Sequence, residues 1–187
     1  PNLGKASNQV TMTIRTSEPI RDLVVSDLGI SSGLENIMVR KTDDDGMEWE
    51  ALGSVQSSAS GPVTFDFQVT DRAGNQGVSV TQTTDQTSVE LDTTPPTLMP
   101  VKLASNNKLS SSLAKSGDNL TLSFTSSEPI PAPTVTLTGA SVTASNASGN
   151  GIDWVVVQPV DSSTPNELAA FSISFGDLAG NPGADVT

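Results

Sequence analysis

The stretches TDRAGNQG, residues 70–77, and FGDLAGNPG, residues 175–183, share the pattern Asp-x-Ala-Gly-Asn. Apolar and polar residues alternate immediately before each copy, over residues 65–69 in the first and 171–175 in the second. A period of two is typical of a half-buried strand, whose side chains point alternately to its two faces. The sequence therefore predicts one strand that ends near each Asp.

Two further landmarks recur in the same order as this pattern. They are the stretch Ser-Glu-Pro-Ile and a tryptophan that follows an Asp-Gly or Asn-Gly pair. The separations are 110 residues for Glu18 and Glu128, 105 for Trp49 and Trp154, and 106 for Asp71 and Asp177. A nearly constant period over three landmarks indicates two homologous modules whose loops differ in length.

The stretch LDTTPPTL, residues 91–98, separates the modules, because its two prolines favour an extended and stiff connection. We expect module one at 1–93 and module two at 94–187, with the first strand of the former and the last strand of the latter largely missing. Many short strands between Gly, Asn, Asp and Pro turns predict an all-β chain of two tandem antiparallel β-sandwiches. We also expect an unpaired edge beside the strand at 171–175.

Composition argues against several functions. The 187 residues include no His, Cys or Tyr, so no usual general base or thiolate nucleophile is present and we expect no enzyme. The formal charge of −12 opposes binding to nucleic acid or anionic membranes, and no apolar run is long enough for direct membrane insertion. The same charge favours a hard cation such as calcium.

Strand order suggests where that cation binds. In a sandwich of alternating strand directions, the second and sixth strands end at the same pole, where the linker from the preceding module enters. Asp92 of the linker, Glu128 and Asp177 are therefore predicted to converge, with Asn181 as a weaker ligand. Glu18 and Asp71 would form the equivalent half-site of module one. The alternative is that each Asp merely caps a glycine turn.

Two other features have structural interpretations that we favour. The acidic stretch TDDDG, residues 42–46, resembles a calcium loop, but Asp45-Gly46 aligns with Asn150-Gly151, and both pairs suit a type I′ hairpin turn. Each Trp then belongs to the returning strand, and sugar stacking is the less favoured role.

Taken together, the SEPI stretches, the Trp after DG or NG, the DRAGN and DLAGN turns and the DTTPPT linker resemble the bacterial Ig-like repeats of large surface proteins and adhesins. The resemblance covers nearly the whole chain. It implies Ig-like sandwiches arrayed in tandem, exported to the cell surface or beyond, with junctions stiffened by calcium in many arrays, much as in cadherins.

Two functions remain open at this point. The favoured one is a structural extender whose partners are neighbouring Ig-like repeats of the same parent chain, with host or matrix glycan and protein bound through other domains. The alternative is a glycan- or protein-binding module. With only two Trp and five Phe, most of them needed for two cores, the composition favours the extender.

Overall fold

A computed structural model describes residues 2–29 and 33–187 of the chain, and every regular element in these ranges is a strand. The chain divides into two compact units, Pro1–Thr94 and Pro95–Thr187. In each unit the sheets pack face to face around one core, so the prediction of an all-β chain of two sandwiches is confirmed.

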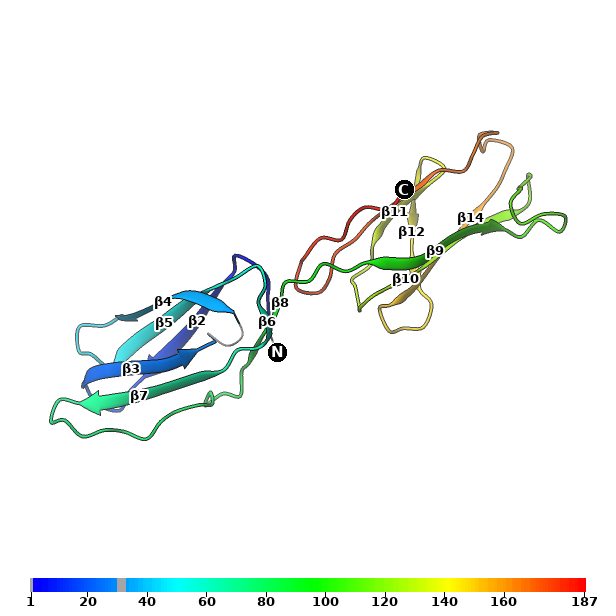
Figure 1. Cartoon of the computed structure of the whole chain (residues 1–187). Helices are drawn as coiled ribbons and strands as arrows, with labels where there is room; N and C mark the ends of the chain where they lie inside the picture. The colour runs from blue at the N-terminus through cyan, green and yellow to red at the C-terminus, as the bar shows by residue number, and fades with distance from the viewer. Residues whose placement is uncertain (1, 30–32) are drawn as a thin grey trace. The chain divides into compact units, whose positions relative to one another are not determined.

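The first unit contains eight strands in the part of it that the structure describes. These are β1 (Asn2–Gly4), β2 (Gln9–Arg15), β3 (Ile20–Leu28), β4 (Leu34–Lys41), β5 (Glu48–Val55), β6 (Ser60–Pro62), β7 (Phe65–Asp71) and β8 (Val89–Asp92). They form sheets of order β2-β5-β4, β3-β7 and β1-β8-β6, and β1 runs parallel to β8 while the other neighbouring strands in these sheets are antiparallel. Figure 1 shows β3 and β7 side by side in front of the β2-β5-β4 sheet.

The second unit contains the remaining seven strands. These are β9 (Leu98–Ser105), β10 (Asn119–Ser126), β11 (Thr134–Leu137), β12 (Ala140–Thr143), β13 (Ser145–Asn146), β14 (Asp153–Pro159) and β15 (Phe171–Ser174). One sheet has the order β13-β14-β10-β9 and the other has the order β12-β11-β15, all with antiparallel pairs.

Alternating sequence produces alternating burial, as the pattern predicts. Along β10 every second residue is buried, and Leu120, Leu122 and Phe124 point into the core. They meet Val135 and Ile173 of the opposite sheet, both fully buried. This interleaving of two apolar faces is what holds the sandwich together, at about 25 cal/mol for each Å² of apolar surface removed from water.

The predicted open edge beside β15 is wrong. The chain turns back after residue 181, and Val186 exchanges two backbone hydrogen bonds with Ile173, of 2.9 and 3.1 Å. Gly183 also donates to the carbonyl of Phe175. The few residues after the second Asp-x-Ala-Gly-Asn turn are enough to cover this edge because the turn reverses the chain directly onto it.

The predicted type I′ turns are also wrong, although the segments do connect neighbouring strands. Type I′ needs a two-residue loop with positive φ at both central residues. Six residues separate β4 from β5 and β13 from β14. Gly46 and Gly151 have positive φ, whereas Asp45 and Asn150 do not. Because the loops are longer than two residues, Asp45 and Asn150 do not need the left-handed conformation.

Truncation of the core should destabilise the second unit by a large amount. We expect Leu122→Ala to lower its free energy of unfolding by about 2–5 kcal/mol, because Leu122 is fully buried and its removal leaves a cavity. Urea unfolding in a Trp49→Phe background, where Trp154 is the sole fluorescent indole, measures the second unit alone. Leu109→Ala is the control, since Leu109 is 97% exposed and should change stability by less than about 0.5 kcal/mol.

Candidate functional site

The first Asp-x-Ala-Gly-Asn turn is closed by its own acid. Asp71 ends β7, and its Oδ1 accepts a hydrogen bond of 2.8 Å from the backbone amide of Asn75. The Asn75 side-chain amide donates to Oδ2 of the same carboxylate at 2.7 Å. Gly74 has φ +96°, a conformation that residues with a Cβ avoid. The pattern is therefore a compact turn tied by one carboxylate.

The second turn repeats this geometry with one more bond. Oδ1 of Asp177 accepts from the backbone amides of Gly180 at 2.7 Å and Asn181 at 2.8 Å. The Asn181 side-chain amide donates to Oδ2 at 2.7 Å. Gly180 has φ +91°. Asp177 therefore caps its turn, as the alternative to a calcium ligand predicted, and it lies three residues after the end of β15.

The two copies differ in burial. Asp177 is 4% exposed and Asn181 is 6% exposed, whereas Asp71 is partly exposed and Asn75 is exposed. The alanines of the pattern differ as well, since Ala73 is exposed and Ala179 is partly buried.

The SEPI stretches also adopt one geometry in both units. The hydroxyl of Thr16 donates to the carbonyl of Glu18 at 2.7 Å, and that of Ser126 donates to the carbonyl of Glu128 at 2.5 Å. A hydroxyl that bonds two residues ahead is a typical local turn at a strand end. Each Glu thereby lies just after the second strand of its unit, which is β2 in the first unit and β10 in the second.

Each tryptophan forms a hydrogen bond to the loop that precedes its strand. The indole N–H of Trp49 donates to the carbonyl of Gly46 at 3.2 Å, and that of Trp154 donates to the carbonyl of Gly151 at 3.1 Å. Trp154 is only 6% exposed. The prediction that these residues belong to the returning strands β5 and β14 is confirmed, and both rings use their polar edge within the unit.

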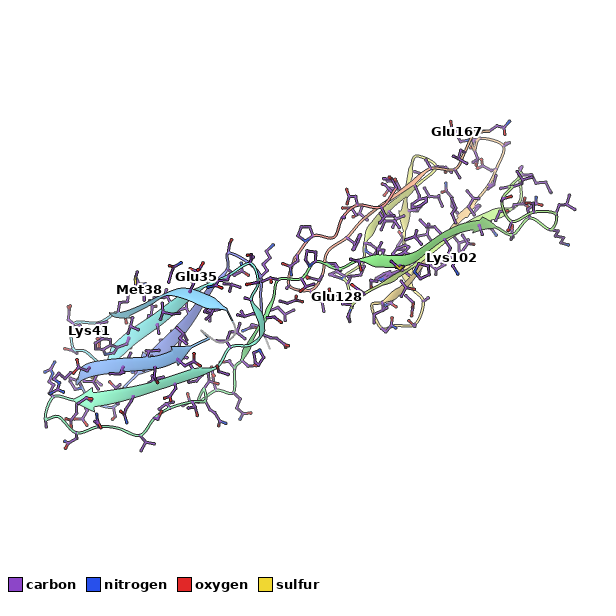
Figure 2. All side chains as sticks on the ribbon, viewed as in Figure 1. Glu35, Met38, Lys41, Lys102, Glu128 and Glu167 are labelled. Carbon is purple, nitrogen blue, oxygen red and sulfur yellow. The ribbon has the colours of Figure 1, made fainter. Side chains whose placement is uncertain are left out.

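Glu128 and Asp177 are brought together in the second unit. Each offers a carboxylate oxygen, and these oxygens lie within 4.8 Å of one another. Glu128 is partly buried, and Figure 2 shows it beyond the end of β10. Two ionised carboxylates at this separation repel by roughly 3 kcal/mol at an effective dielectric constant near 20. A cation between them would convert that repulsion into attraction.

Asp92 and Asn181 each take part in a local hydrogen bond. Asp92 ends β8 in the first unit, is partly buried, and accepts a hydrogen bond of 3.0 Å from the amide of Thr94. Asn181 holds Asp177 through its side-chain amide. In the first unit Glu18 is exposed, and within residues 2–29 and 33–187 no group of three acidic side chains converges around Glu18 or Asp71.

One anchor of the site was missed by sequence reasoning. Thr97 and Ser127 are bonded twice, since the Thr97 amide donates to the Ser127 hydroxyl at 3.0 Å and the Ser127 amide donates to the Thr97 carbonyl at 2.9 Å. This pair ties the start of β9 to the residue next to Glu128. The sequence signal that could have indicated this pair is the recurrence of Ser and Thr around both SEPI stretches.

The acidic stretch at 42–46 forms no comparable cluster. Oδ1 of Asp43 accepts from the amides of Gly46 at 2.9 Å and Met47 at 3.1 Å, which caps the β4–β5 loop. The second unit achieves the same closure with Asn150, whose side-chain oxygen accepts from the Ile152 amide at 2.8 Å. The consecutive acids are therefore best explained as a capped loop.

Comparison with solved structures finds the D00-D0 domain of intimin. The two chains are 13% identical, and the match covers 99% of this chain and 93% of that chain with a TM-score of 0.40. No family model and no curated protein matches the chain. Where the structure describes the chain, none of its segments is a helix of the length and apolarity needed to cross a membrane.

Acid should weaken the first unit through Asp71. Hydrogen bonds from the side chain and then the backbone of Asn75 lower the pKa of Asp71 below its usual 3.8, because they favour the charged form. A lowered pKa in the folded state contributes stability above the unfolded pKa, and this contribution is lost as pH falls through the folded value.

We therefore expect the free energy of unfolding to fall more steeply below about pH 4 in the wild type than in Asp71→Asn. Urea unfolding of both proteins between pH 7 and pH 3 measures the difference. The comparison removes the general effect of titrating the other acids. Parallel curves would show that the turn does not depend on the charge of Asp71.

Proposed function

We propose that the chain is an extender: tandem Ig-like modules of a large, exported bacterial surface or secreted adhesin-like protein. The observation that carries this proposal is repetition. The Asp turn, the SEPI turn and the bonded Trp have the same geometry in both units. Repetition of the same turns in both units suits a protein in which many such modules follow one another along the chain.

The chemistry of the loops supports the extender over the alternative of a glycan-binding module. Sugar recognition commonly uses exposed aromatic faces. Trp154 is buried, and the polar edge of each indole is bonded to a backbone carbonyl of its own unit. We accordingly propose a non-enzymatic module whose partners are neighbouring repeats, with ligands left to other domains.

We further propose that calcium binds at Glu128 and Asp177, with Asp92 as the third ligand and the Asn181 oxygen as a weaker one. Calcium prefers carboxylate and carbonyl oxygens in flexible geometry. A carboxylate has about four lone-pair positions, and the N–H donors of Gly180 and Asn181 use three of those of Asp177. The turn therefore orients this carboxylate and still leaves it able to bind a cation.

Chain connectivity supports the assignment of Asp92. Thr97 is bonded to Ser127, the neighbour of Glu128. Asp92 lies five residues before Thr97, so the extended chain limits their separation to roughly 17 Å. The Pro95-Pro96 pair narrows the conformations of the segment between them. Of the acids in the first unit, Asp92 is therefore the one separated from Thr97 by the fewest residues along the chain.

A cation held by ligands from both sides of the linker would stiffen the linker. Calcium would bind the arrangement with all ligands in place better than the others and would shift the population toward it. Glu18 and Asp71 would serve the same purpose toward a preceding module, with the linker acid supplied by that module. The proposed calcium thus acts structurally, as a ligand-dependent stiffener of the extender.

Calcium affinity should depend on Glu128. We expect the chelator-treated wild type to bind calcium in the range of about 10⁻⁴–10⁻³ M, as extracellular modules do, and Glu128→Gln to bind at least about tenfold more weakly because ligand charge is lost. Isothermal titration calorimetry measures both. Glu18→Gln is the matched control, because it changes the equivalent SEPI acid of the first unit and should leave this affinity unchanged.

A wild type that takes up no calcium at millimolar concentration would contradict the calcium proposal and leave the extender proposal standing. Equal weakening by Glu128→Gln and Glu18→Gln would show a diffuse effect of net charge. Asp177→Ala provides a second arm, but it also removes the cap of a buried turn, so Glu128→Gln is the cleaner substitution.

Calcium should also narrow the distribution of distances between the units. The chain has no Cys, so Thr84→Cys and Ser116→Cys, both at exposed positions, introduce one label site in each unit. Single-molecule energy transfer with and without calcium measures the distribution. We expect narrowing in the wild-type background and none in Glu128→Gln. A broad distribution that calcium leaves unchanged would contradict a stiffening role.

A further inference from the structure

The loop between β13 and β14 contains the only Asn-Gly pair of the sequence, Asn150-Gly151. The only Asp-Gly pair, Asp45-Gly46, lies in the equivalent loop of the first unit. An Asn or Asp side chain before Gly can react with the backbone amide that follows it, because Gly carries no side chain to obstruct the approach. Asn is accordingly among the residues that are chemically unstable in proteins. The two loops therefore place one chemistry in two environments.

The attacking atom of this chemistry is the glycine amide nitrogen, and its partners differ between the two loops. The Gly46 amide donates to Oδ1 of Asp43 at 2.9 Å. At the separation of 105 residues, the position of Asp43 is taken by Ser148 in the second unit. The Ser148 hydroxyl donates to Oδ2 of Asp153 at 3.0 Å. The Gly151 amide donates no hydrogen bond to any residue in 2–29 or 33–187, so it is available for reaction.

The group that is attacked is the side-chain carbonyl of Asn150, and backbone amides polarise it. Its Oδ1 accepts hydrogen bonds from the amides of Ile152 at 2.8 Å and Asp153 at 3.2 Å. Donors to a carbonyl oxygen stabilise the negative charge that this oxygen acquires when a nucleophile adds to the carbon. Asn150 is exposed, so water also reaches the site. The loop therefore presents an activated carbonyl next to an amide without a hydrogen-bond partner.

The fold requires glycine at position 151. Gly151 has φ +74°, a conformation that residues with a Cβ rarely adopt. A Cβ on this residue would also lie 3.3 Å from Cβ of Pro129 and 3.4 Å from the carbonyl oxygen of Ile130. Asn150 has a separate structural role, since its side-chain oxygen closes the loop. Each residue of the pair is thus explained by structure, and their reactivity follows from their adjacency.

We propose that Asn150 is a site of spontaneous covalent modification, in which the Gly151 amide attacks its side chain and the residue becomes aspartate or isoaspartate. No enzyme is required, because the two reacting groups belong to adjacent residues and water is the only other reactant. The equivalent pair in the first unit is protected, because Asp43 holds the Gly46 amide. This modification is independent of the calcium proposal.

The reaction has two steps. In the first, the Gly151 nitrogen loses its proton to solvent base and bonds Cγ of Asn150, the Cγ–Nδ2 bond breaks, and Nδ2 leaves with a solvent proton as ammonia. A cyclic succinimide remains, and water then adds to one of its two carbonyl carbons. Breaking the bond from the Gly151 nitrogen to Cγ gives aspartate, whereas breaking its bond to the backbone carbonyl carbon gives isoaspartate. One water is consumed, one ammonia is released, and the new carboxyl ionises.

Modification would change the contacts that this loop makes with the SEPI turn. The Gly151 carbonyl accepts hydrogen bonds from the Ile130 amide at 2.9 Å and from the indole of Trp154 at 3.1 Å. Isoaspartate adds a methylene to the backbone immediately before Gly151 and would displace this carbonyl. Either product replaces the Nδ2 donor, 3.3 Å from Oδ2 of Asp153, by a carboxylate oxygen, so the contact becomes repulsive. The turn that carries Glu128 would lose part of its support, since Ile130 lies two residues after Glu128.

The test incubates the folded full chain in mildly alkaline buffer and maps its peptides by mass spectrometry. We expect conversion at Asn150 before any other Asn, with the mass change that replaces NH2 by OH. The product should be more acidic on anion exchange, and isoaspartyl methyltransferase should label its isoaspartate fraction. Conversion should become faster as pH rises, since the attacking amide must lose its proton.

Asp45→Asn provides the matched comparison, because it creates a second Asn-Gly pair in the equivalent loop. We expect this pair to react about tenfold more slowly than Asn150, because the Gly46 amide must first give up its hydrogen bond to a carboxylate. Adding Asp43→Ala should remove most of the difference. Adding Asp44→Ala should leave it unchanged, since the hydrogen bond between Asp43 and Gly46 is retained.

Asn150→Ser should abolish the new species and keep the loop closed, since a hydroxyl can replace the amide oxygen as acceptor. No conversion at Asn150 in the folded chain, over a period in which the urea-unfolded chain is converted, would overturn the proposal. Equal rates at Asn150 and in Asp45→Asn would also overturn it, because the held amide would then give no protection.

Discussion

Hydrogen bonds from a Gly-Asn pair back to the preceding Asp carboxylate determine the local geometry on which much of this structure depends. In the second unit they hold Asp177 three residues after β15 and reverse the chain there, so that Val186 pairs with Ile173. The same bonds fix the position of the acid beside Glu128. One short turn thus completes a sheet edge and orients a candidate ligand, which explains why a single pattern serves both purposes.

Burial changes what this turn can do in each unit. The Asp177 carboxylate is almost inaccessible to solvent, whereas Asp71 is partly exposed with nearly the same bonds. A buried carboxylate is costly to leave uncompensated, and three N–H donors together with a cation would compensate it. The exposed copy is compensated by water. This difference makes the second unit the stronger candidate for a metal site, although the two turns have the same sequence pattern.

The comparison of β2 with β10 shows how one neighbour alters a strand that is otherwise conserved between the two units. β9 completes the burial of Leu122 and bonds the outward amides of β10. In the first unit Met12, which stands at the position of Leu122, is partly buried. Strand pairing and core packing are therefore coupled, because a neighbouring strand provides both the backbone hydrogen bonds of the sheet and the side chains that cover the core.

The sequence by itself determined the strands, the repeat and the turns that close the strands. Alternation along residues 119–126 and the separation of the SEPI and Asp-x-Ala-Gly-Asn landmarks were sufficient, because side-chain period and turn formation are properties of a short stretch of backbone. Alternating strand directions predicted that Glu128 and Asp177 approach each other, and their carboxylates do, although Asp177 follows the seventh strand of its unit and not the sixth.

Only the tertiary structure decided which groups are buried, which edges are covered and how long the turns are. The exposure of Ala73, the cap formed by Asp43 and the return of Val186 onto Ile173 were not evident from the sequence. Each depends on contacts between residues far apart in the chain or on the exact path of a loop. A local pattern states that a strand has an edge, but the arrival of a second segment determines whether that edge is filled.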